Sequence, residues 1–196
     1  MSAQLFQIEA SGTNAGKSLL FAYGANMNPV QLNERCSHPL RVTTAFLQDY
    51  RIGFYGHSKI WDGALETAIE AKGSRLWGTL FSLSNRDWDQ LDLWQDARFD
   101  GTGKYFHNPV RVCDMQGKCY EARIYKKDLL GAPCPPSTQY MQHIIDGARQ
   151  NHLPPAYVES LLAIPTAPAH YAVPMRTGSI PTAAAEASCE GCASTY

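Results

Sequence analysis

The chain has 196 residues, of which 44% are hydrophobic and 18% are charged, and its formal net charge is −1. This length and composition fit one globular domain with a single sizeable core. The near-neutral charge gives no argument for binding nucleic acid or a membrane surface, and no apolar run approaches the roughly 20 residues of a membrane span. Because Met1–Lys17 lacks the basic and apolar regions of a signal peptide, we expect a cytoplasmic protein. Monomer and homodimer both remain open.

The cysteines and histidines do not predict a metal site. Cys189 and Cys192 have CxxC spacing but no second pair, so we interpret them as a tail pair open to oxidation or adventitious metal. The six histidines show no paired spacing. In a cytoplasmic protein the other cysteines are expected to be reduced, buried thiols. These are Cys36, Cys113, Cys119 and Cys134.

Short apolar runs and turn residues predict the first elements. Residues 1–16 have little periodicity and are expected to form a flexible leader. Lys17–Tyr23 is typical of a buried strand, and Asn28-Pro29 is typical of the N-cap and first turn of a short helix. Arg41–Leu47 is predicted to be a strand, and Tyr50–Tyr55 continues its β character.

Strict alternation of side chains predicts the next two strands. In Ala64–Glu70, one face carries Leu, Thr and Ile, and the other carries Glu66 and Glu70 with two alanines, which is also the pattern of a solvated strand face. Arg75–Ser82 alternates in the same way. We therefore expect the two stretches to pair with each other as a hairpin across Lys72-Gly73.

A helix and a hairpin are predicted next. Ser84–Asp87 resembles an N-cap and the first turn of a helix. The apolar stripe of this helix consists of Trp88, Leu91, Leu93 and Trp94. After a loop, Tyr105–Met115 and Cys119–Tyr125 are typical of two strands joined at Gln116-Gly117.

The last predicted elements are two helices. Ser137 is a suitable N-cap for a helix over Tyr140–Asn151, and Pro154–Ile164 predicts a second, shorter one. From residue 165 to 196 the composition shifts to Ala, Pro, Thr and Ser, so we expect an extended or disordered tail after a domain over residues 17–164. The order of the elements predicts an α+β fold whose mixed or antiparallel sheet curls into a small β-barrel.

The chain turns abruptly at Tyr23-Gly24-Ala25-Asn26, directly after the first predicted strand. Gly24 can adopt positive φ and lets a ligand approach the backbone, and Asn26 tolerates the left-handed conformation. Several N–H groups of Tyr23–Met27 can then point into one concavity, which suits a carboxylate or a developing oxyanion. A tight turn between a strand and a helix explains the same residues equally well.

Several motifs between Leu19 and Ile164 together resemble those of a known family. They are the Phe21–Met27 loop, Trp77-Gly78, Leu91-Asp92, Tyr105, Pro136–Tyr140, Ile144–Ala148 and Leu153–Tyr157. In this order they resemble the γ-glutamylcyclotransferase family, whose Tyr-Gly-Ser-Asn-Leu loop is similar to the first of them. The resemblance implies a small mixed barrel with peripheral helices and a cavity at this loop.

The resemblance also implies a reaction. The α-amine of a γ-glutamyl compound attacks its own γ-carbonyl and releases 5-oxoproline and a free amine. The chemistry needs a base, donors for the oxyanion and an anchor for the α-carboxylate, but no metal or organic cofactor. The amides of Tyr23–Met27 can supply the donors or the anchor. Tyr105, Tyr125 and Tyr140 match family tyrosines near the pocket and could donate phenol hydrogen bonds, although packing at a barrel rim explains them as well.

The general base is where this chain departs from the family. The family glutamate lies in a Leu-Asp-x-x-Glu-Gly pattern, and here its position falls on Gln95, which can contact substrate but cannot act as a carboxylate base. Asp96 can reach the same space if the loop bulges, and Asp100 is a weaker third choice. Glu66 stands where the family commonly has alanine, and it reaches the pocket from another wall if its strand face lines the cavity. Glu66, Asp96 and the loss of any base remain open.

The loop after the middle helix bears on the substrate. Trp94–Gly103 is unlike the housekeeping members and resembles fungal relatives found with secondary-metabolite pathways, including those that make epidithiodioxopiperazines such as gliotoxin. That resemblance implies removal of γ-glutamyl groups from a glutathione-conjugated metabolite. Two alternatives are an isomerase or cyclase acting on a metabolite amine, and a binding protein that has lost the family base.

Overall fold

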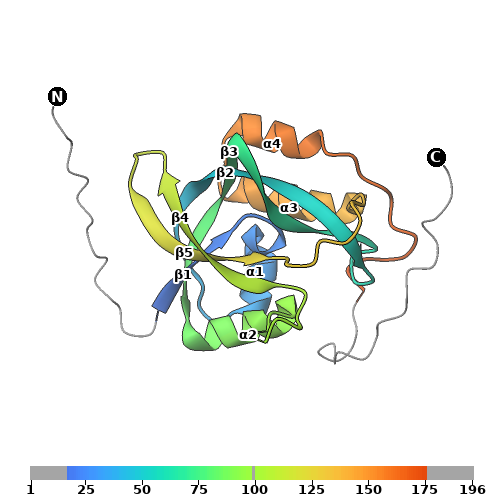
Figure 1. Ribbon diagram of the computed structural model, residues 1–196, viewed down its shortest axis with the longest axis horizontal. Coiled ribbons are helices and arrows are strands. Elements are labelled where there is room, and N and C mark those ends of the chain that lie inside the picture. The colour runs from blue at the N-terminus through green and yellow to red at the C-terminus, as the bar shows by residue number, and fades with distance from the viewer. Residues whose placement is uncertain (1–16, 99, 176–196) are drawn as a thin grey trace.

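A closed barrel of five strands is the centre of the computed structural model, which describes residues 17–98 and 100–175. The strands are β1 (Lys17–Ala22), β2 (Leu40–Ser58), β3 (Gly63–Ser84), β4 (Phe106–Asp114) and β5 (Cys119–Lys126). The helices are the short 3₁₀ helix η1 (Ala25–Met27), α1 (Pro29–Arg35), α2 (Asn85–Gln95), α3 (Thr138–Gln150) and α4 (Pro155–Leu162). The predicted α+β barrel is therefore confirmed (Figure 1).

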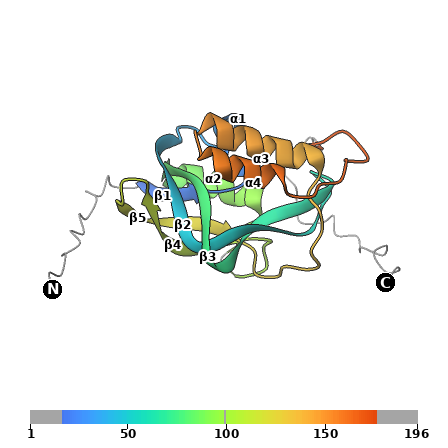
Figure 2. The ribbon, with the colours of Figure 1, turned by 90° about the horizontal axis from the view of Figure 1, so that it is seen from above.

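The barrel order is β1-β3-β2-β4-β5, with four antiparallel pairings and one parallel contact that closes it. The closing contact joins Leu20 of β1 to Arg123 of β5. Figure 2 shows α1, α3 and α4 together on one side of the strands. Buried apolar residues accordingly form two clusters, one contributed mainly by the strands and one where the helices pack on the barrel. In the part of the chain that the structure describes, no helix is long and apolar enough to cross a membrane.

The predicted hairpin between Ala64–Glu70 and Arg75–Ser82 is wrong. Both stretches belong to the single strand β3, and both pair with β2, with Ile69 opposite Arg51 and Arg75 opposite Gln48. Gly73 has the left-handed φ of +82° that a turn requires, but its N–H donates to the Asp49 side chain of β2 at 2.7 Å. Asp49 also has positive φ, at 63°. The two strands therefore bend together at this point, and the chain does not reverse.

Side-chain caps set the starts of three helices, as predicted. The Asn28 side chain accepts from Val30 N at 3.0 Å, and Ser137 accepts from Tyr140 N at 3.3 Å. Ser84 and Asp87 form a reciprocal capping box at the start of α2.

The apolar stripe of α2 is narrower than predicted. Trp88 and Leu91 are buried, whereas Leu93 and Trp94 are 55% and 45% exposed. The α2 helix lies at the barrel edge and buries only one side, and the Arg35 guanidinium covers the Trp94 ring at 5.0 Å.

The cysteines in the described residues differ from the prediction at Cys134, which is only partly buried, and at one pair. Cys113 and Cys119 stand directly opposite each other in the β4–β5 register and form a disulfide. The expectation of reduced thiols is wrong for this pair, because sequence spacing alone did not reveal that the hairpin register brings them together. Cys36 remains a buried thiol, and burial raises its pKa to about 12. Cys189 and Cys192 lie outside the described residues.

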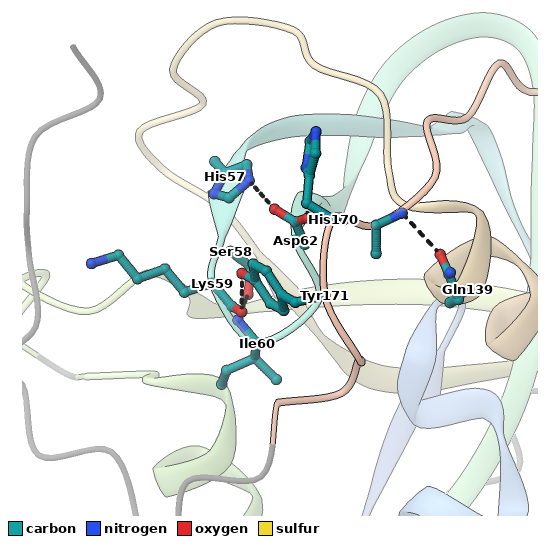
Figure 3. A network of polar contacts seen from close by, with 9 residues as sticks. His57, Ser58, Lys59, Ile60, Asp62, Gln139, His170 and Tyr171 are labelled. Atoms are coloured by element: carbon teal, nitrogen blue, oxygen red, sulfur yellow. Dashed lines mark hydrogen bonds and ion pairs between the residues drawn. The ribbon is translucent and has the colours of Figure 1, made fainter. Parts of the chain in front are cut away.

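The start of the predicted tail is extended chain that lies against the β2–β3 turn (Figure 3). We call residues 166–175 the strap. Asp62 in the turn accepts from the His170 N–H at 2.6 Å and also contacts the rings of His57 and His170. The Tyr171 hydroxyl donates to Lys59 O at 2.6 Å, and Met175 N donates to Ile60 O at 2.7 Å. The strap therefore holds the turn that leads into β3. The leader over residues 1–16 and the rest of the tail lie outside the described residues.

Candidate active site

A pocket opens where the chain leaves β1. Side chains from β3, the end of α2, the segment before β4, and β5 surround the loop that follows β1. Its lining residues are Leu20, Phe21, Ala22, Tyr23, Gly24, Asn26, Glu66, Gln95, Tyr105 and Tyr125. The pocket thus brings together seven of the predicted site residues: Tyr23, Gly24, Asn26, Glu66, Gln95, Tyr105 and Tyr125.

Glu66 is the one carboxylate among these lining residues. It points inward from β3 and is only 6% exposed. Its Oε1 accepts the Ala25 N–H at 3.0 Å, and its Oε2 accepts the hydroxyl hydrogen of Tyr140. The two donors come from different elements, the loop after β1 and α3, and together they hold the carboxylate in one position. The face of β3 that alternation assigned to Glu66 is therefore the face that lines the pocket.

Gly24 provides the space that Glu66 occupies. A Cβ atom at this position would stand 2.2 Å from Glu66 Oε1 and 2.3 Å from its Cγ, far inside van der Waals contact. The expected positive φ is wrong, because Gly24 has φ −127°. Glycine is needed here for the close approach of the carboxylate and not for a left-handed turn.

The four tyrosine hydroxyls at the site all donate to protein groups. Tyr105 donates to Glu66 O at 2.7 Å, Tyr23 donates to Tyr125 O at 2.5 Å, and Tyr140 donates to the Glu66 carboxylate. Tyr125 donates to Asp92 Oδ1 at 2.5 Å. Burial, followed by a nearby carboxylate, raises the pKa of each phenol, so all four remain protonated. Their protons therefore point to protein acceptors and not into the pocket.

Two of the five predicted loop amides are already used. Ala25 N donates to Glu66, and Met27 N donates to Gly24 O at 2.9 Å. The Met27 side chain is fully buried in the core and does not line the pocket. The closing of the chain into η1 explains both results, because it turns Met27 inward.

The Asn26 side chain is oriented by two neighbours in α1. Its Oδ1 accepts from Arg35 Nη1 at 3.0 Å and from Gln31 Nε2 at 3.3 Å. Among the described residues its amide nitrogen has no hydrogen-bond partner, and Asn26 lines the pocket. The side-chain N–H₂ group is therefore available as a donor. Asn26 does not have the expected left-handed conformation, because it lies within η1.

Two residues that hold this loop were not predicted as part of the site. Asn151 Nδ2 donates to Met27 O at 2.7 Å and to Gly147 O at 2.8 Å, tying the loop to α3. Arg35 approaches the loop from α1, and burial lowers its pKa. No motif marks either residue, because each partner is distant in sequence or lies on another helix.

The carboxylates that follow α2 lie outside this pocket. Asp96 ends α2 in the left-handed conformation, with φ 48°, and its carboxylate accepts from Arg98 Nε at 3.0 Å. Asp100 is exposed and bonds Thr102. Neither lines the pocket, whereas Gln95 does. The loop does not bulge inward as the Asp96 hypothesis required. In the described ranges, no group of three or more His, Cys, Asp or Glu residues is placed to hold a metal ion.

Comparison with known proteins agrees with this geometry. Residues 75–161 match the model of the AIG2-like family. The γ-glutamylcyclotransferase of Homo sapiens is 29% identical over 160 residues, covering 80% of this chain and 83% of that protein. The bovine (Bos taurus) enzyme is 29% identical over 164 residues, covering 81% and 85%. A solved γ-glutamyl cyclotransferase structure superposes with a TM-score of 0.74 and 29% identity, over 80% of this chain and 93% of that one. Over about four-fifths of its length, this chain is thus similar in sequence and fold to γ-glutamylcyclotransferases.

Proposed function

We propose that this protein releases 5-oxoproline from a γ-glutamyl compound and that Glu66 is its general base. The observation that carries the proposal is a buried carboxylate, held by Ala25 N and the Tyr140 hydroxyl, that lines the pocket. Gln95, at the family position of the base, lines the same pocket from α2. The carboxylate is therefore retained in the pocket but comes from the β3 wall.

The reaction can be written with these groups. Glu66 takes one proton from the α-ammonium, and the amine lone pair then attacks the γ-carbonyl carbon, whose π electrons move to the oxygen. When the oxyanion collapses, the bond to the leaving nitrogen breaks and Glu66 returns its proton there. Glu66 next takes the remaining extra proton of the ring nitrogen and passes it to the released amine. The products are 5-oxoproline and an ammonium compound.

The donors come from the loop after β1. Arg35 and Gln31 hold the Asn26 oxygen, which leaves the amide nitrogen of this pocket-lining residue available as a donor. Preorganised donors of this kind stabilise an oxyanion without reorganisation during the reaction. Together with the Gly24 backbone, Asn26 can hold either the oxyanion or the substrate α-carboxylate.

For the substrate we propose a glutathione-conjugated secondary metabolite. The support is the resemblance of Trp94–Gly103 to fungal relatives found with gliotoxin-type pathways, together with the exposure of much of this loop beside the pocket. The γ-glutamyl group would occupy the pocket, and the bulky amine portion would lie against the exposed loop.

The test is 5-oxoproline release from γ-glutamyl amino acids, glutathione and glutathione conjugates. Glu66→Gln should lower kcat by about 10² to 10⁴-fold, the range expected when a general base is lost. Glu70→Gln is the matched control, because Glu70 lies on the same strand but is exposed. It should stay within about twofold of the wild type.

The panel also separates the substrates and the alternative functions. Faster turnover of conjugates than of free γ-glutamyl amino acids supports the metabolite substrate, and the reverse contradicts it. If the wild type releases no 5-oxoproline but binds the same compounds tightly, the protein is a binding protein. An unchanged Glu66→Gln rate removes Glu66 as the base.

A further inference from the structure

A second polar cluster lies directly behind the pocket, at the end of α2. Asp92 Oδ1 accepts the Tyr125 hydroxyl at 2.5 Å and contacts His107 Nε2 at 2.7 Å. The side chains of His107 and Asp92 are 13% and 16% exposed. Neither Asp92 nor His107 has a role in the reaction written above.

The fold brings the three side chains together from three elements, α2, β4 and β5. His107 on β4 and Tyr125 on β5 are direct cross-strand partners, and their rings meet edge to face with centroids 5.2 Å apart. Trp88, one turn before Asp92 on α2, packs against the His107 ring with the ring centroids 5.0 Å apart. The Arg123 guanidinium lies over the Trp88 ring, 4.0 Å from its centroid. Cross-strand pairing and aromatic packing therefore fix the direction from which Asp92 meets Tyr125.

Tyr125 forms a boundary between two hollows. It lines the pocket that contains Glu66, whereas Asp92 and His107 line a neighbouring hollow with Ala97 and Arg98. Because an ionised carboxylate can only accept, the Tyr125 proton points out of the first pocket toward Asp92. The Tyr125 oxygen then presents its lone pairs to that pocket, and the hydrogen bond to an anion increases their negative charge.

This polarity suits a cation more than an oxyanion. A γ-glutamyl substrate carries one cation at its reacting end, the α-ammonium, which must lie close to Glu66 to lose a proton. The Tyr105 hydroxyl, which donates to Glu66 O, likewise offers its oxygen on this side. Glu66, Tyr125 and Tyr105 therefore each contribute an acceptor oxygen among the residues that line the pocket.

We propose that Asp92, supported by His107, is a positioning residue that orients the Tyr125 hydroxyl as a hydrogen-bond acceptor for the substrate α-ammonium. The inference rests on the proposed function, because it assigns a place to the γ-glutamyl group in the same pocket. It divides the pocket into an acceptor side at Glu66 and Tyr125 and a donor side at Asn26.

The experiment is a double-mutant cycle on kcat/KM for 5-oxoproline release. Asp92→Asn and Tyr125→Phe should each lower kcat/KM by about tenfold, the effect of losing one hydrogen bond to a charged group. Since Asp92 acts through Tyr125, the kcat/KM of the double variant should be no lower than that of the less active single variant. Asp89→Asn, on the exposed side of the same helix, is the control and should match the wild type. Additive losses of about a hundredfold would overturn the proposal.

A pair of ligands tests which substrate group Tyr125 contacts. A glutaryl amide has the same skeleton as the substrate but lacks the α-ammonium, so it cannot cyclise. Its binding constant, measured by calorimetry, should stay within about twofold in Asp92→Asn and Tyr125→Phe, whereas the matching γ-glutamyl compound should bind about tenfold more weakly. Equal weakening of both ligands means that Asp92 only supports the fold, which overturns the proposal.

Two further arms keep the test decisive. If Asp92→Asn does not fold, two variants of His107 replace it. His107→Gln keeps a donor to Asp92 and should still bind the γ-glutamyl compound more tightly than the glutaryl amide, whereas His107→Leu should lose this difference. The proposal is overturned if the two variants have the same preference. If the wild type releases no 5-oxoproline, the proposed function fails, and the calorimetric comparison still decides the present inference. Wild-type protein that does not distinguish the two ligands overturns it.

Discussion

Two regions of the molecule compete to supply the base, and their surroundings differ. Glu66 lies on β3, a strand paired on both sides, and donors from the loop after β1 and from α3 hold its carboxylate. Asp96 lies at the end of α2, where its side chain is 36% exposed and bonds Arg98 two residues away. A carboxylate is positioned for chemistry when its partners come from different elements, because only then does the whole fold determine where it lies.

The largest effect is expected from Gly24→Ala, which attacks the β3 wall from the loop side. The new Cβ would stand 2.2 Å from Glu66 Oε1, so the carboxylate must leave its position. We expect kcat/KM to fall by about a hundredfold or more, as when a catalytic group is misplaced by about 1 Å, and the free energy of unfolding to fall by about 1–3 kcal/mol. Steady-state kinetics and thermal unfolding measure the two effects.

The control for that variant is Gly73→Ala, at the bend of β3. It introduces backbone strain, because Gly73 has φ +82°, but its Cβ meets no atom within 4 Å. A loss of stability without a loss of activity is expected. Comparable activity losses in both variants would show that general destabilisation, and not the position of Glu66, explains the Gly24 result.

Tyr140→Phe should give the next largest effect. It removes one of the two donors to the Glu66 carboxylate and leaves the ring packed on Trp61, whose centroid is 4.7 Å away. A hydrogen bond to a charged group typically contributes about 1.5–3 kcal/mol, so a decrease of about tenfold or more in kcat/KM is expected. The control is Tyr171→Phe, which removes a hydroxyl of the strap that donates to Lys59 O in the β2–β3 turn. It should leave kcat/KM unchanged. A Tyr140→Phe enzyme with wild-type kcat/KM would mean that Ala25 N alone holds Glu66.

Asp96→Asn tests the other region and should have a much smaller effect. The carboxylate lies outside the pocket and is bound by Arg98, so a change within about twofold in kcat/KM is expected. Kinetics on the same substrates as for Glu66→Gln provide the comparison. A hundredfold loss in Asp96→Asn would reverse the order of the two regions and place the base in the loop after α2.

The smallest effect on activity is expected from Asp62→Asn, which tests the anchoring of the β3 wall from outside. The hydrogen bond from His170 N, followed by the rings of His170 and His57, holds the pKa of Asp62 below its ordinary value of 3.8. A lowered folded-state pKa means that the charged Asp62 stabilises the strap above about pH 3.8, and that this contribution is lost as pH falls through the lowered pKa.

Amide hydrogen exchange at His170 measures this contribution. Protection in the wild type should exceed that in Asp62→Asn at pH 7, and the difference should shrink below pH 3.8. Protection that does not depend on pH or on Asp62 would show that Tyr171 and Met175 alone hold the strap.

The parts of the fold that sequence predicted well depend on short-range signals. Asn28, Ser84 and Ser137 start their helices through contacts within three residues, and the β4–β5 hairpin turns at Gln116-Gly117. The bend of β3 could not be predicted in this way. Gly73 suits either a turn or a bend, and its partner Asp49, 24 residues earlier, decides between them.

The site was predictable only where one element determines the geometry. Alternation along β3 assigned Glu66 to one face, and the resemblance identified the loop after β1. The partners of Glu66 were beyond such reasoning, because Tyr140 lies 74 residues later. Asp92 and Tyr125 are separated by 33 residues and share no motif spacing, so their hydrogen bond is visible only in the folded chain.

The position of Glu66 on a barrel strand has a consequence for how this enzyme can change. Among the described residues of the segment that follows α2, 96–98 and 100–104, none lines the pocket that contains Glu66. With Glu66 as the proposed base, exposed side chains there, such as those of Arg98 and Asp100, can be exchanged without moving the reacting group. Gly103 is an exception, because a Cβ there would stand 2.2 Å from Asp96 O. This separation makes the segment the natural place to build libraries for new amine partners, and it gives a physical reason why substrate range can diversify in a lineage without rebuilding the chemistry.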